Sequence, residues 1–345
     1  MSSDTYSNPR LFIGDKEITT FKSIQFSESG KSTASSLNCT LGDPHLRDAP
    51  LTNKEITFYL NYGSVDTVPL FRGRIRQVTP SETQVQIVAH DVRTFLTGNE
   101  SIPLSLTDTD NYDGYTLGQF LYDYITEYVN INETIIGLDF LNDTDPVTSL
   151  SGYRGNNLNA LKIITGNLPK NKDDLSKIKN NRLTIIDDGV KSNICFVKEQ
   201  DLDNAAVRFS YSDGINKLSV KKRPAPNMLT GKVNNVNVIY KHNNLSTGIQ
   251  GGKIKGKFSD PDEAKEAAFI QATYAENDSE ITLDVSKGHY LSIGNVVFVN
   301  TREYPEQSGK QRIVSKQITC SGSTVTCRLQ LSKERPQLSE FLSSN

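Results

Sequence analysis

Short runs of alternating apolar and polar residues dominate the first hundred positions. The runs are LFIGDKEI, FKSIQFSES, SSLNCTLGD, KEITFYLNY, LFRGRIRQV and TQVQIVAHD, and Gly, Pro, Ser and Asn separate them. A period of two places successive side chains on opposite faces of a strand. Strands this closely spaced predict a small β-sandwich or β-barrel domain over residues 1–98.

The hydrophobic period changes after Gly98. In GYTLGQFLYDYITEYV the apolar positions recur at i, i+3, i+4 and i+7, which predicts an amphipathic helix, and NNLNALKIITGNL predicts a shorter one. RLTIID and NICFVKE then predict a hairpin around Asp187-Asp188-Gly189. Together these patterns indicate a mixed α/β domain over residues 99–215.

Strand patterns return in residues 216–333. NKLSVKKR, VNNVNVIYKH and GGKIKGKF precede one helix, predicted over about 260–277, with Asp260 as N-cap and Pro261 at its first position. The remaining residues up to 333 are again typical of strands. We therefore predict a second β domain over residues 216–333, followed by a C-terminal tail, 334–345.

The two β regions have the same order of elements. SSLNCTLGD, KEITFYLN, LFRGRIRQV and TQVQIVA can be aligned with SEITLDV, IGNVVFVN, SGKQRIVSK and STVTCRLQL. The alignment places residues 56–61 against 296–300 and residues 73–75 against 309–313. It matches Leu37 and Leu41 only loosely with Ile281 and Leu283. The pattern predicts an internal duplication, in which both regions share one strand order.

A row of arginines follows one strand of the first region, at Arg72, Arg74 and Arg76. Three interpretations are open: a solvated outer face, a contact between subunits or domains, and nucleic-acid binding. The chain has a net charge of −2, and no aromatic residues lie between these arginines, so nucleic-acid recognition is disfavoured. Because the planar guanidinium group suits carboxylates, we expect at least one arginine to pair with Asp or Glu across a subunit or domain boundary.

No group of residues predicts catalysis or a cofactor. The four histidines and four cysteines are scattered along the chain, without the spacing of a metal site or a disulfide framework. His90-Asp91 is expected to be a hydrogen-bonded strand end, because no nucleophile motif accompanies it. The sequence has no long apolar run and no apolar core near its start, so we expect a soluble protein without a membrane anchor. An assembly or binding protein fits better than an enzyme.

Several motifs resemble a known family. F-x-G-x-I-x-x-V, Q-V-Q-I-V-A-H-D-x-x-x-F-L and Y-T-L-G-Q-F-L resemble the opening of baseplate hub proteins of contractile-tailed bacteriophages. EITLDV, YLSIGNVVFV and SGKQRIVSKQIT are similar to the closing module of that family and of the hub part of type VI secretion spike proteins. The resemblance spans residues 10 to 333.

The resemblance implies a mainly β fold with an α+β insertion, in which two tail-tube-like β-barrels share one chain with a mixed α/β middle domain. It also implies a homotrimer whose six barrels join a six-fold tail tube to a three-fold spike and leave a channel for DNA. The implied partners are a central spike protein, a tail tube or tube-initiator protein and baseplate wedge proteins, in a tail baseplate assembled in the host bacterial cytoplasm. DNA would pass through the lumen only transiently.

The C-terminal tail carries three apolar residues, Leu338, Phe341 and Leu342. Two interpretations are open, a frayed end and an arm that docks on a neighbouring protein. For the whole chain the alternatives are a carbohydrate-binding receptor-recognition tail module and another tube-fold tail component, such as a distal tail protein. An enzyme is the least favoured class.

Overall fold

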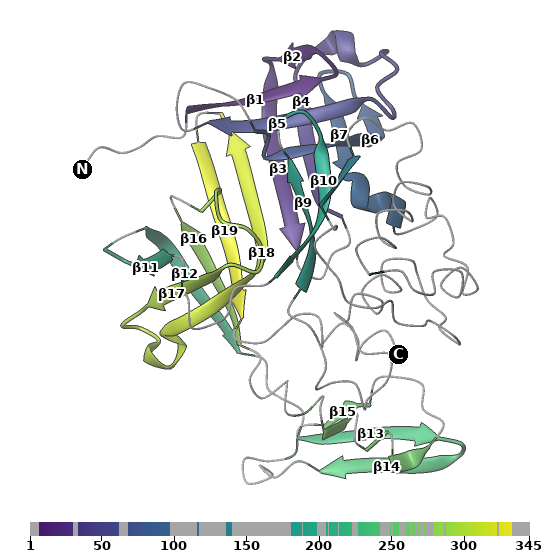
Figure 1. The fold of residues 1–345 in the computed structure, drawn as a ribbon, viewed down its shortest axis with the longest axis vertical. Helices are drawn as coiled ribbons and strands as arrows, with labels where there is room; N and C mark the ends of the chain where they lie inside the picture. The colour runs from purple at the N-terminus through teal and green to yellow at the C-terminus, as the bar shows by residue number, and fades with distance from the viewer. Residues whose placement is uncertain are drawn as a thin grey trace. The chain divides into compact units, whose positions relative to one another are not determined.

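The computed structural model describes residues 7–29, 34–61, 68–96, 136–139, 181–187, 189–198, 207–212, 214–222, 227–241, 251–254, 279–285, 288–322 and 324–332, with single positions between them and parts of 260–272. These residues are mostly β-strand, as predicted (Figure 1). The chain divides into two compact units. Unit 1 comprises residues 1–199 and 316–327, and unit 2 comprises residues 200–315 and 328–345. The helices predicted after Gly98 and the C-terminal tail lie outside the described residues.

Unit 1 contains an antiparallel sheet made by the first seven strands. They are β1 (Ser7–Ile13), β2 (Lys16–Ile18), β3 (Phe21–Ser29), β4 (Ser36–Leu41), β5 (Glu55–Asn61), β6 (Phe71–Pro80) and β7 (Val85–His90). Their order across the sheet is β3-β4-β7-β6-β5-β1-β2. The run LFIGDKEI is two strands rather than one, because Gly14 adopts a φ of 57° and turns β1 back into β2.

The hairpin predicted around Asp187 is also in unit 1. β9 (Asn181–Asp187) and β10 (Ser192–Lys198) pair in antiparallel fashion, and β8 (Ile136–Asp139) runs parallel to β10. Gly189, with a φ of 91°, lies in the turn between β9 and β10. The hairpin prediction is confirmed.

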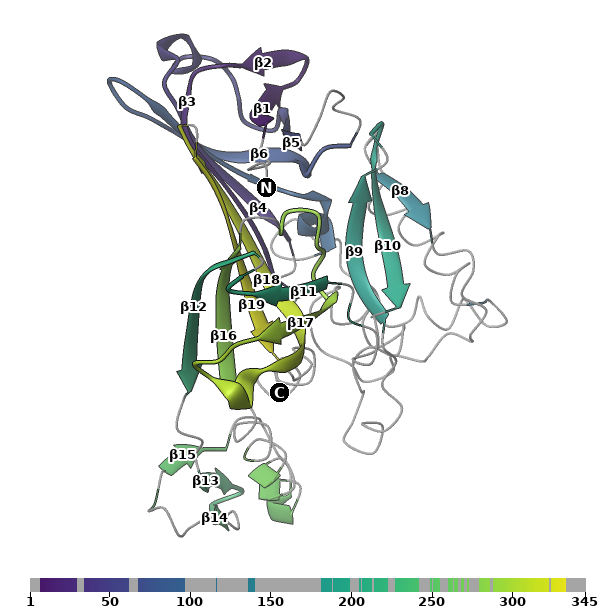
Figure 2. The same ribbon diagram turned by 90° about the vertical axis from the view of Figure 1, so that its left-hand side faces the viewer.

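A second series of paired strands, most of it in unit 2, has the order β12-β16-β19-β18-β17-β11 (Figure 2). Because β18 also lies beside β3, both series belong to one 13-stranded sheet, and they are called the two main sheets below. The strands of the second series are β11 (Val207–Ser210), β12 (Ile215–Lys222), β16 (Ser279–Val285), β17 (Val296–Asn300), β18 (Gly309–Ser321) and β19 (Thr324–Ser332). The tip of the β18–β19 hairpin, residues 316–327, belongs to unit 1. Residues 207–210 were predicted to lie in the middle domain, whereas β11 pairs with β17 and its Phe209 is buried.

Three strands and a helix in unit 2 form a separate small assembly. β13 (Met228–Val233), β14 (Val236–Lys241) and β15 (Gly251–Lys253) make their own sheet, whereas the sequence pattern predicted these residues as part of the second β domain. The run VNNVNVIYKH is not a single strand, because Asn234 and Asn235 have φ angles of 48° and 66° and form the turn between β13 and β14.

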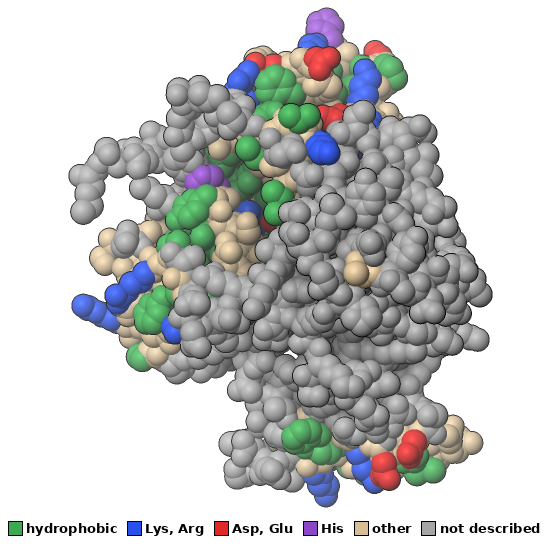
Figure 3. Space-filling model, in the orientation of Figure 1, with side chains coloured by type: hydrophobic (Ala, Val, Ile, Leu, Met, Phe, Trp, Pro, Cys, Tyr) green, Lys and Arg blue, Asp and Glu red, His purple; other side chains and the backbone are tan. Residues whose placement is uncertain are grey.

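The helix predicted from Asp260 packs on this small sheet. The Asp260 side chain accepts a hydrogen bond from the Asp262 amide at 3.0 Å, so the predicted N-cap is confirmed. Ala264, Ala268 and Ala272, spaced four residues apart, are buried against strand residues of the same assembly. In Figure 3 hydrophobic, basic and acidic side chains are interspersed on the described part of this assembly, at the bottom of the view.

The strand orders of the two main sheets are the same. β3-β4-β7-β6-β5-β1 in unit 1 corresponds to β12-β16-β19-β18-β17-β11 in unit 2. The predicted shared strand order is therefore confirmed. The sheets differ at their last strand, because β1 is antiparallel to β5 whereas β11 is parallel to β17.

The correspondence extends to the residue register. A register shift lies between Phe21 and Ser23 in the β3–β4 pair, and another lies between Ile215 and Lys217 in the β12–β16 pair. Aligning the two shifts gives three matched pairs of buried residues, which are Leu37 with Ile281, Cys39 with Leu283, and Leu41 with Val285. This register replaces the loose alignment made from the sequence.

The turn before β5 is repeated before β17. Ile75 accepts a hydrogen bond from the Asn53 amide at 2.8 Å and donates one to the Lys54 carbonyl at 3.0 Å. Ile313 accepts a hydrogen bond from the Gly294 amide at 2.8 Å and donates one to the Asn295 carbonyl at 2.9 Å. Ile75 therefore corresponds to Ile313. This places residues 73–75 within the predicted match to 309–313, and it shifts the match of β5 with β17 by one residue.

Candidate assembly surfaces

Arg72, Arg74 and Arg76 lie on β6 and are backed by buried residues. Phe71, Gly73 and Ile75 alternate with the arginines and are buried, as the sequence pattern predicted. A Cβ atom at position 73 would collide with the carbonyl group of His90 on β7, so glycine is required for the two strands to approach this closely.

Arg72 makes a charged contact with a residue far away in the sequence. Its Nε donates to Asp187 Oδ2 at 2.7 Å, and its Nη1 donates to Glu55 Oε1 at 2.9 Å. Its Nη2 also donates to the Gly189 carbonyl at 3.2 Å. The expected pairing with a carboxylate is present for Arg72, and both partners lie in unit 1. The contact fixes the β9–β10 turn on the β5–β6 strand pair.

The contact between Arg72 and Asp187 is shielded from water. The Arg72 side chain is 9% exposed and the Asp187 side chain 7%. Burial by itself lowers the pKa of Arg72, but the hydrogen bond to Asp187 and the charges of Asp187 and Glu55 outweigh it and raise the pKa. Asp187 also accepts hydrogen bonds from the Gly189 amide at 2.8 Å and the Ser192 hydroxyl at 3.0 Å. Arg72 therefore stays charged and its carboxylate partner is held in place.

Arg74 and Arg76 point toward the turn before β5. Arg74 Nη1 donates to the Asn53 carbonyl at 2.9 Å. Arg76 Nη2 donates to the Thr94 hydroxyl at 3.2 Å, and its Nη1 lies 3.5 Å from Asn53 Oδ1. Arg72 is therefore directed to the β9–β10 turn, whereas Arg74 and Arg76 share Asn53 as a partner.

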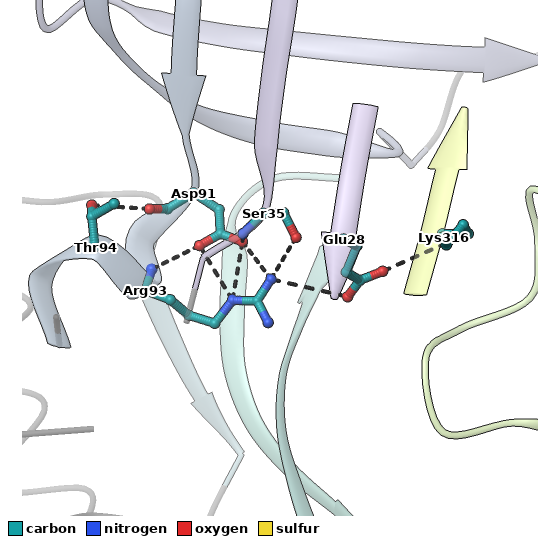
Figure 4. A network of polar contacts seen from close by, with 6 residues as sticks. All are labelled: Glu28, Ser35, Asp91, Arg93, Thr94 and Lys316. Atoms are coloured by element: carbon teal, nitrogen blue, oxygen red, sulfur yellow. Dashed lines mark hydrogen bonds and ion pairs between the residues drawn. The ribbon is translucent and has the colours of Figure 1, made fainter. Parts of the chain in front are cut away.

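A buried polar network lies where β7 ends (Figure 4). Asp91 accepts hydrogen bonds from the Ser35 amide at 2.8 Å and from Arg93 Nη2 at 2.6 Å. Arg93 also donates to the Ser35 hydroxyl. Burial lowers the pKa of Arg93, whereas the charge of Asp91 and, more weakly, that of Glu28 raise it. The net result is a raised pKa. The expectation that His90-Asp91 is a hydrogen-bonded strand end is confirmed.

Glu28 on β3 connects this network to the C-terminal hairpin. Its Oε1 lies 3.9 Å from Arg93 Nη2, and its Oε2 lies 3.7 Å from Lys316 Nζ on β18. The Lys316 ammonium also lies 5.5 Å from the centroid of the Phe26 ring. Both basic side chains are almost fully buried, so the C-terminal hairpin is fixed to β3 by charge within unit 1.

The described cysteines are free thiols in the core. Cys39, Cys320 and Cys327 are all buried. Burial raises the pKa of Cys39 to about 12, with a smaller contribution from Cys320, and burial raises the pKa of Cys320 to about 12. The thiols of Cys39 and Cys320 are therefore neutral at physiological pH, which makes them poor nucleophiles.

The described residues hold no cluster of three or more His, Cys, Asp or Glu side chains suited to a metal ion. Among the same residues, none of the helices has the length and apolar character needed to cross a bilayer.

The geometry defines a duplicated, mainly β protein whose polar contacts join its own segments. No family model matches the sequence, and no curated protein matches it. Solved structures do match. A tail protein from Neisseria meningitidis has a TM-score of 0.61 and 12% identity, covering 97% of this chain and 98% of that one. The 43 kDa tail protein of prophage MuSo2 from Shewanella oneidensis has a TM-score of 0.60 and 12% identity, covering 96% and 97%.

A third similar structure comes from a secretion system. The Escherichia coli c3393 protein, a type VI secretion component with structural similarity to the phage T4 tail proteins gp27 and gp5, has a TM-score of 0.52 and 9% identity. It covers 95% of this chain and 77% of that one. The chain therefore has the fold of phage tail and type VI secretion proteins, and the resemblance inferred from the sequence motifs is confirmed at the level of fold.

Proposed function

We propose that this chain is the structural baseplate hub of a phage-type contractile tail. In this proposal three copies form a ring, and the β sheets of each copy supply two similar, tube-like barrels. The ring then presents six similar units to a six-fold tail tube and three-fold symmetry to a central spike. DNA passes through the lumen, and baseplate wedge proteins surround the ring in the virion tail.

The observation that carries this proposal is the repeated strand order and register within one chain. A tube subunit needs one such sheet, whereas a protein that adapts six-fold to three-fold symmetry needs two in each of three copies. The matched register shifts at Phe21–Ser23 and Ile215–Lys217 extend the likeness beyond strand order. The fold shared with tail proteins supports the same reading.

The contacts described above favour a structural role over an enzymatic one. The polar networks around Arg72 and Arg93 connect strands to one another. Arg74, Arg76 and the tail residues Leu338, Phe341 and Leu342 are further candidates for contacts with neighbouring proteins. Removal of residues 336–345 tests the tail, because loss of spike or tube binding by an intact ring would assign it a docking role.

The mass of the purified full chain tests the proposal. One chain has a mass of 38.3 kDa. Sedimentation across a range of concentrations should show a species of three times that mass. A chain that stays monomeric at high concentration, in the absence and presence of a tail-tube protein, contradicts the hub function and favours a single-copy binding module.

A further inference from the structure

The tip of the β18–β19 hairpin gives unit 1 a strand neighbour for β3. β18 lies beside β3 in the sheet order, and the hairpin residues 316–327 belong to unit 1. At this contact Lys316 lies between Phe26 and Glu28. Ile24 and Phe26 on β3 and Ile318 on β18 are buried, with exposed fractions of 0%, 3% and 0%.

The duplicated register identifies the strands that correspond to this pair. β18 corresponds to β6, and β3 corresponds to β12. Counting from Ile313 and Ile75, Lys316 matches Val78 and Ile318 matches Pro80. Counting from the aligned register shifts, Phe26 matches Val220 and Glu28 matches Lys222.

The corresponding positions are less buried than those of the β18–β3 contact. Leu218 and Val220 on β12 are half-buried, whereas Ile24 and Phe26 are fully buried. Val78 on β6 is half-buried and Pro80 is exposed, whereas Lys316 and Ile318 are buried. Within the described part of the chain, β12 has only β16 as a strand neighbour. β5 pairs with β6 only over residues 71–74. Residues 77–80 of β6 pair with β7 on one edge, and no described strand pairs with their other edge.

We infer that residues 77–80 of β6 in one copy pair with β12 of a second copy, in the arrangement that β18 and β3 adopt within one chain. This inference rests on the proposed ring and identifies the surface through which its copies meet. β6 of one copy and β12 of the next copy are different parts of the chain, so the contact is head-to-tail. Such a contact can repeat around a closed ring.

The side chains at the two strands are compatible with this pairing. Where the contact within one chain has the ion pair of Lys316 and Glu28, the contact between copies has Val78 and Lys222. A lysine at both positions would place like charges together, and valine at position 78 avoids that repulsion. Val78 and Val220 instead meet as an apolar pair.

Engineered cysteines on the outward, exposed positions of the two strands test the inference. Thr79→Cys on β6 is co-expressed with a second chain carrying Ser219→Cys or Lys221→Cys on β12, in a Cys195→Ser background. The three positions are exposed, so the substitutions are expected to leave the fold intact. The buried thiols Cys39, Cys320 and Cys327 stay out of the reaction. Thr79→Cys co-expressed with Thr230→Cys, exposed on the separate sheet, is the matched control.

Under mild oxidation, at least one of the two β6–β12 combinations should give a covalent dimer of the two different chains. Each single-cysteine chain alone, and the Thr230→Cys control, should give at least tenfold less. If the protein has the mass of a trimer but neither combination cross-links above the control, the ring uses other surfaces and this inference is wrong while the hub function stands. If the protein is monomeric and no pair cross-links, both are wrong.

Discussion

Arg74 and Arg312 perform the same task in the two units. Arg74 Nη1 donates to the Asn53 carbonyl at 2.9 Å, and Arg312 Nη1 donates to the Gly294 carbonyl at 3.0 Å. Asn53 and Gly294 are the residues with positive φ, 66° and 85°, in the turns that precede β5 and β17. One residue further along, Ile75 and Ile313 bond to the same turns. A shared arginine–turn contact at matched positions is difficult to explain without duplication of one β unit.

Replacing either arginine by methionine should destabilise the turn that it contacts. Arg312 is 3% exposed, so Arg312→Met should lower the free energy of unfolding by about 2 kcal/mol, and the more accessible Arg74→Met by about 1 kcal/mol. Urea unfolding followed by circular dichroism measures both. A larger loss for Arg74→Met than for Arg312→Met would show that burial does not set the strength of these bonds.

Removing the Arg72 side chain should release the β9–β10 hairpin. Arg72→Met leaves the buried charge of Asp187 with only the Gly189 and Ser192 donors. We therefore expect the free energy that holds the hairpin on β6 to fall by about 3 kcal/mol. Amide hydrogen exchange in residues 181–198 should accelerate.

The matched control for Arg72 is Arg10, which forms a solvent-exposed ion pair with Glu17. Arg10 Nε lies 2.8 Å from Glu17 Oε1, but the two side chains are 40% and 38% exposed. Arg10→Met should change stability by less than about 1 kcal/mol. Unchanged exchange in residues 181–198 of Arg72→Met would mean that the Asp187 contact does not hold the hairpin.

The Glu28–Lys316 pair should show greater energetic coupling than a better-formed pair at the surface. A double-mutant cycle with Glu28→Gln and Lys316→Met should give a coupling free energy of about 1–2 kcal/mol, because both side chains are largely buried. Arg328 and Asp284 are closer, at 2.7 Å, but their side chains are 54% and 24% exposed. Their cycle, with Arg328→Met and Asp284→Asn, should give less than about 1 kcal/mol. Equal coupling in the two cycles would argue against burial as the cause.

Buried thiols should give the protein a defined response to alkaline pH. The pKa of Cys39 is raised to about 12, whereas an unfolded cysteine ionises near pH 8.5, so between these values the folded state binds more protons. The stabilisation is complete below about pH 8.5 and is lost as the pH rises toward 12. Cys39→Ala should therefore reduce the fall in unfolding free energy between pH 9 and 11. The native protein should resist alkylation at pH 8.5 and react after unfolding, and rapid labelling of Cys39 in the native protein would contradict this account.

Much of the fold was predictable from the sequence because strand alternation is local. The strands around Leu37, Ile75 and Leu283 follow directly from a period of two. The turn at Asn234 and Asn235 was missed, although two consecutive asparagines between apolar residues are a hairpin signal. The register between the repeats could not be predicted, because it depends on two register shifts that leave no clear trace in composition.

The contacts of the arginine row were less predictable than the row itself. Alternation showed that Arg72, Arg74 and Arg76 share a face. The partner of Arg72 lies 115 residues away and is one of 40 acidic residues, so only tertiary structure could identify it. Arg74 and Arg76 donate hydrogen bonds to the Asn53 carbonyl and the Thr94 hydroxyl, and strand alternation alone does not identify these groups either.

Electron cryomicroscopy of the purified full chain tests the central claim most directly. The account predicts rings with three-fold symmetry, in which six similar β units alternate between the sheet of β3–β7 and the sheet of β12 and β16–β19. Each ring should contain three chains of 38.3 kDa around an open channel. Particles with a single chain, or rings in which each chain contributes only one of the two sheets to the wall, would contradict it.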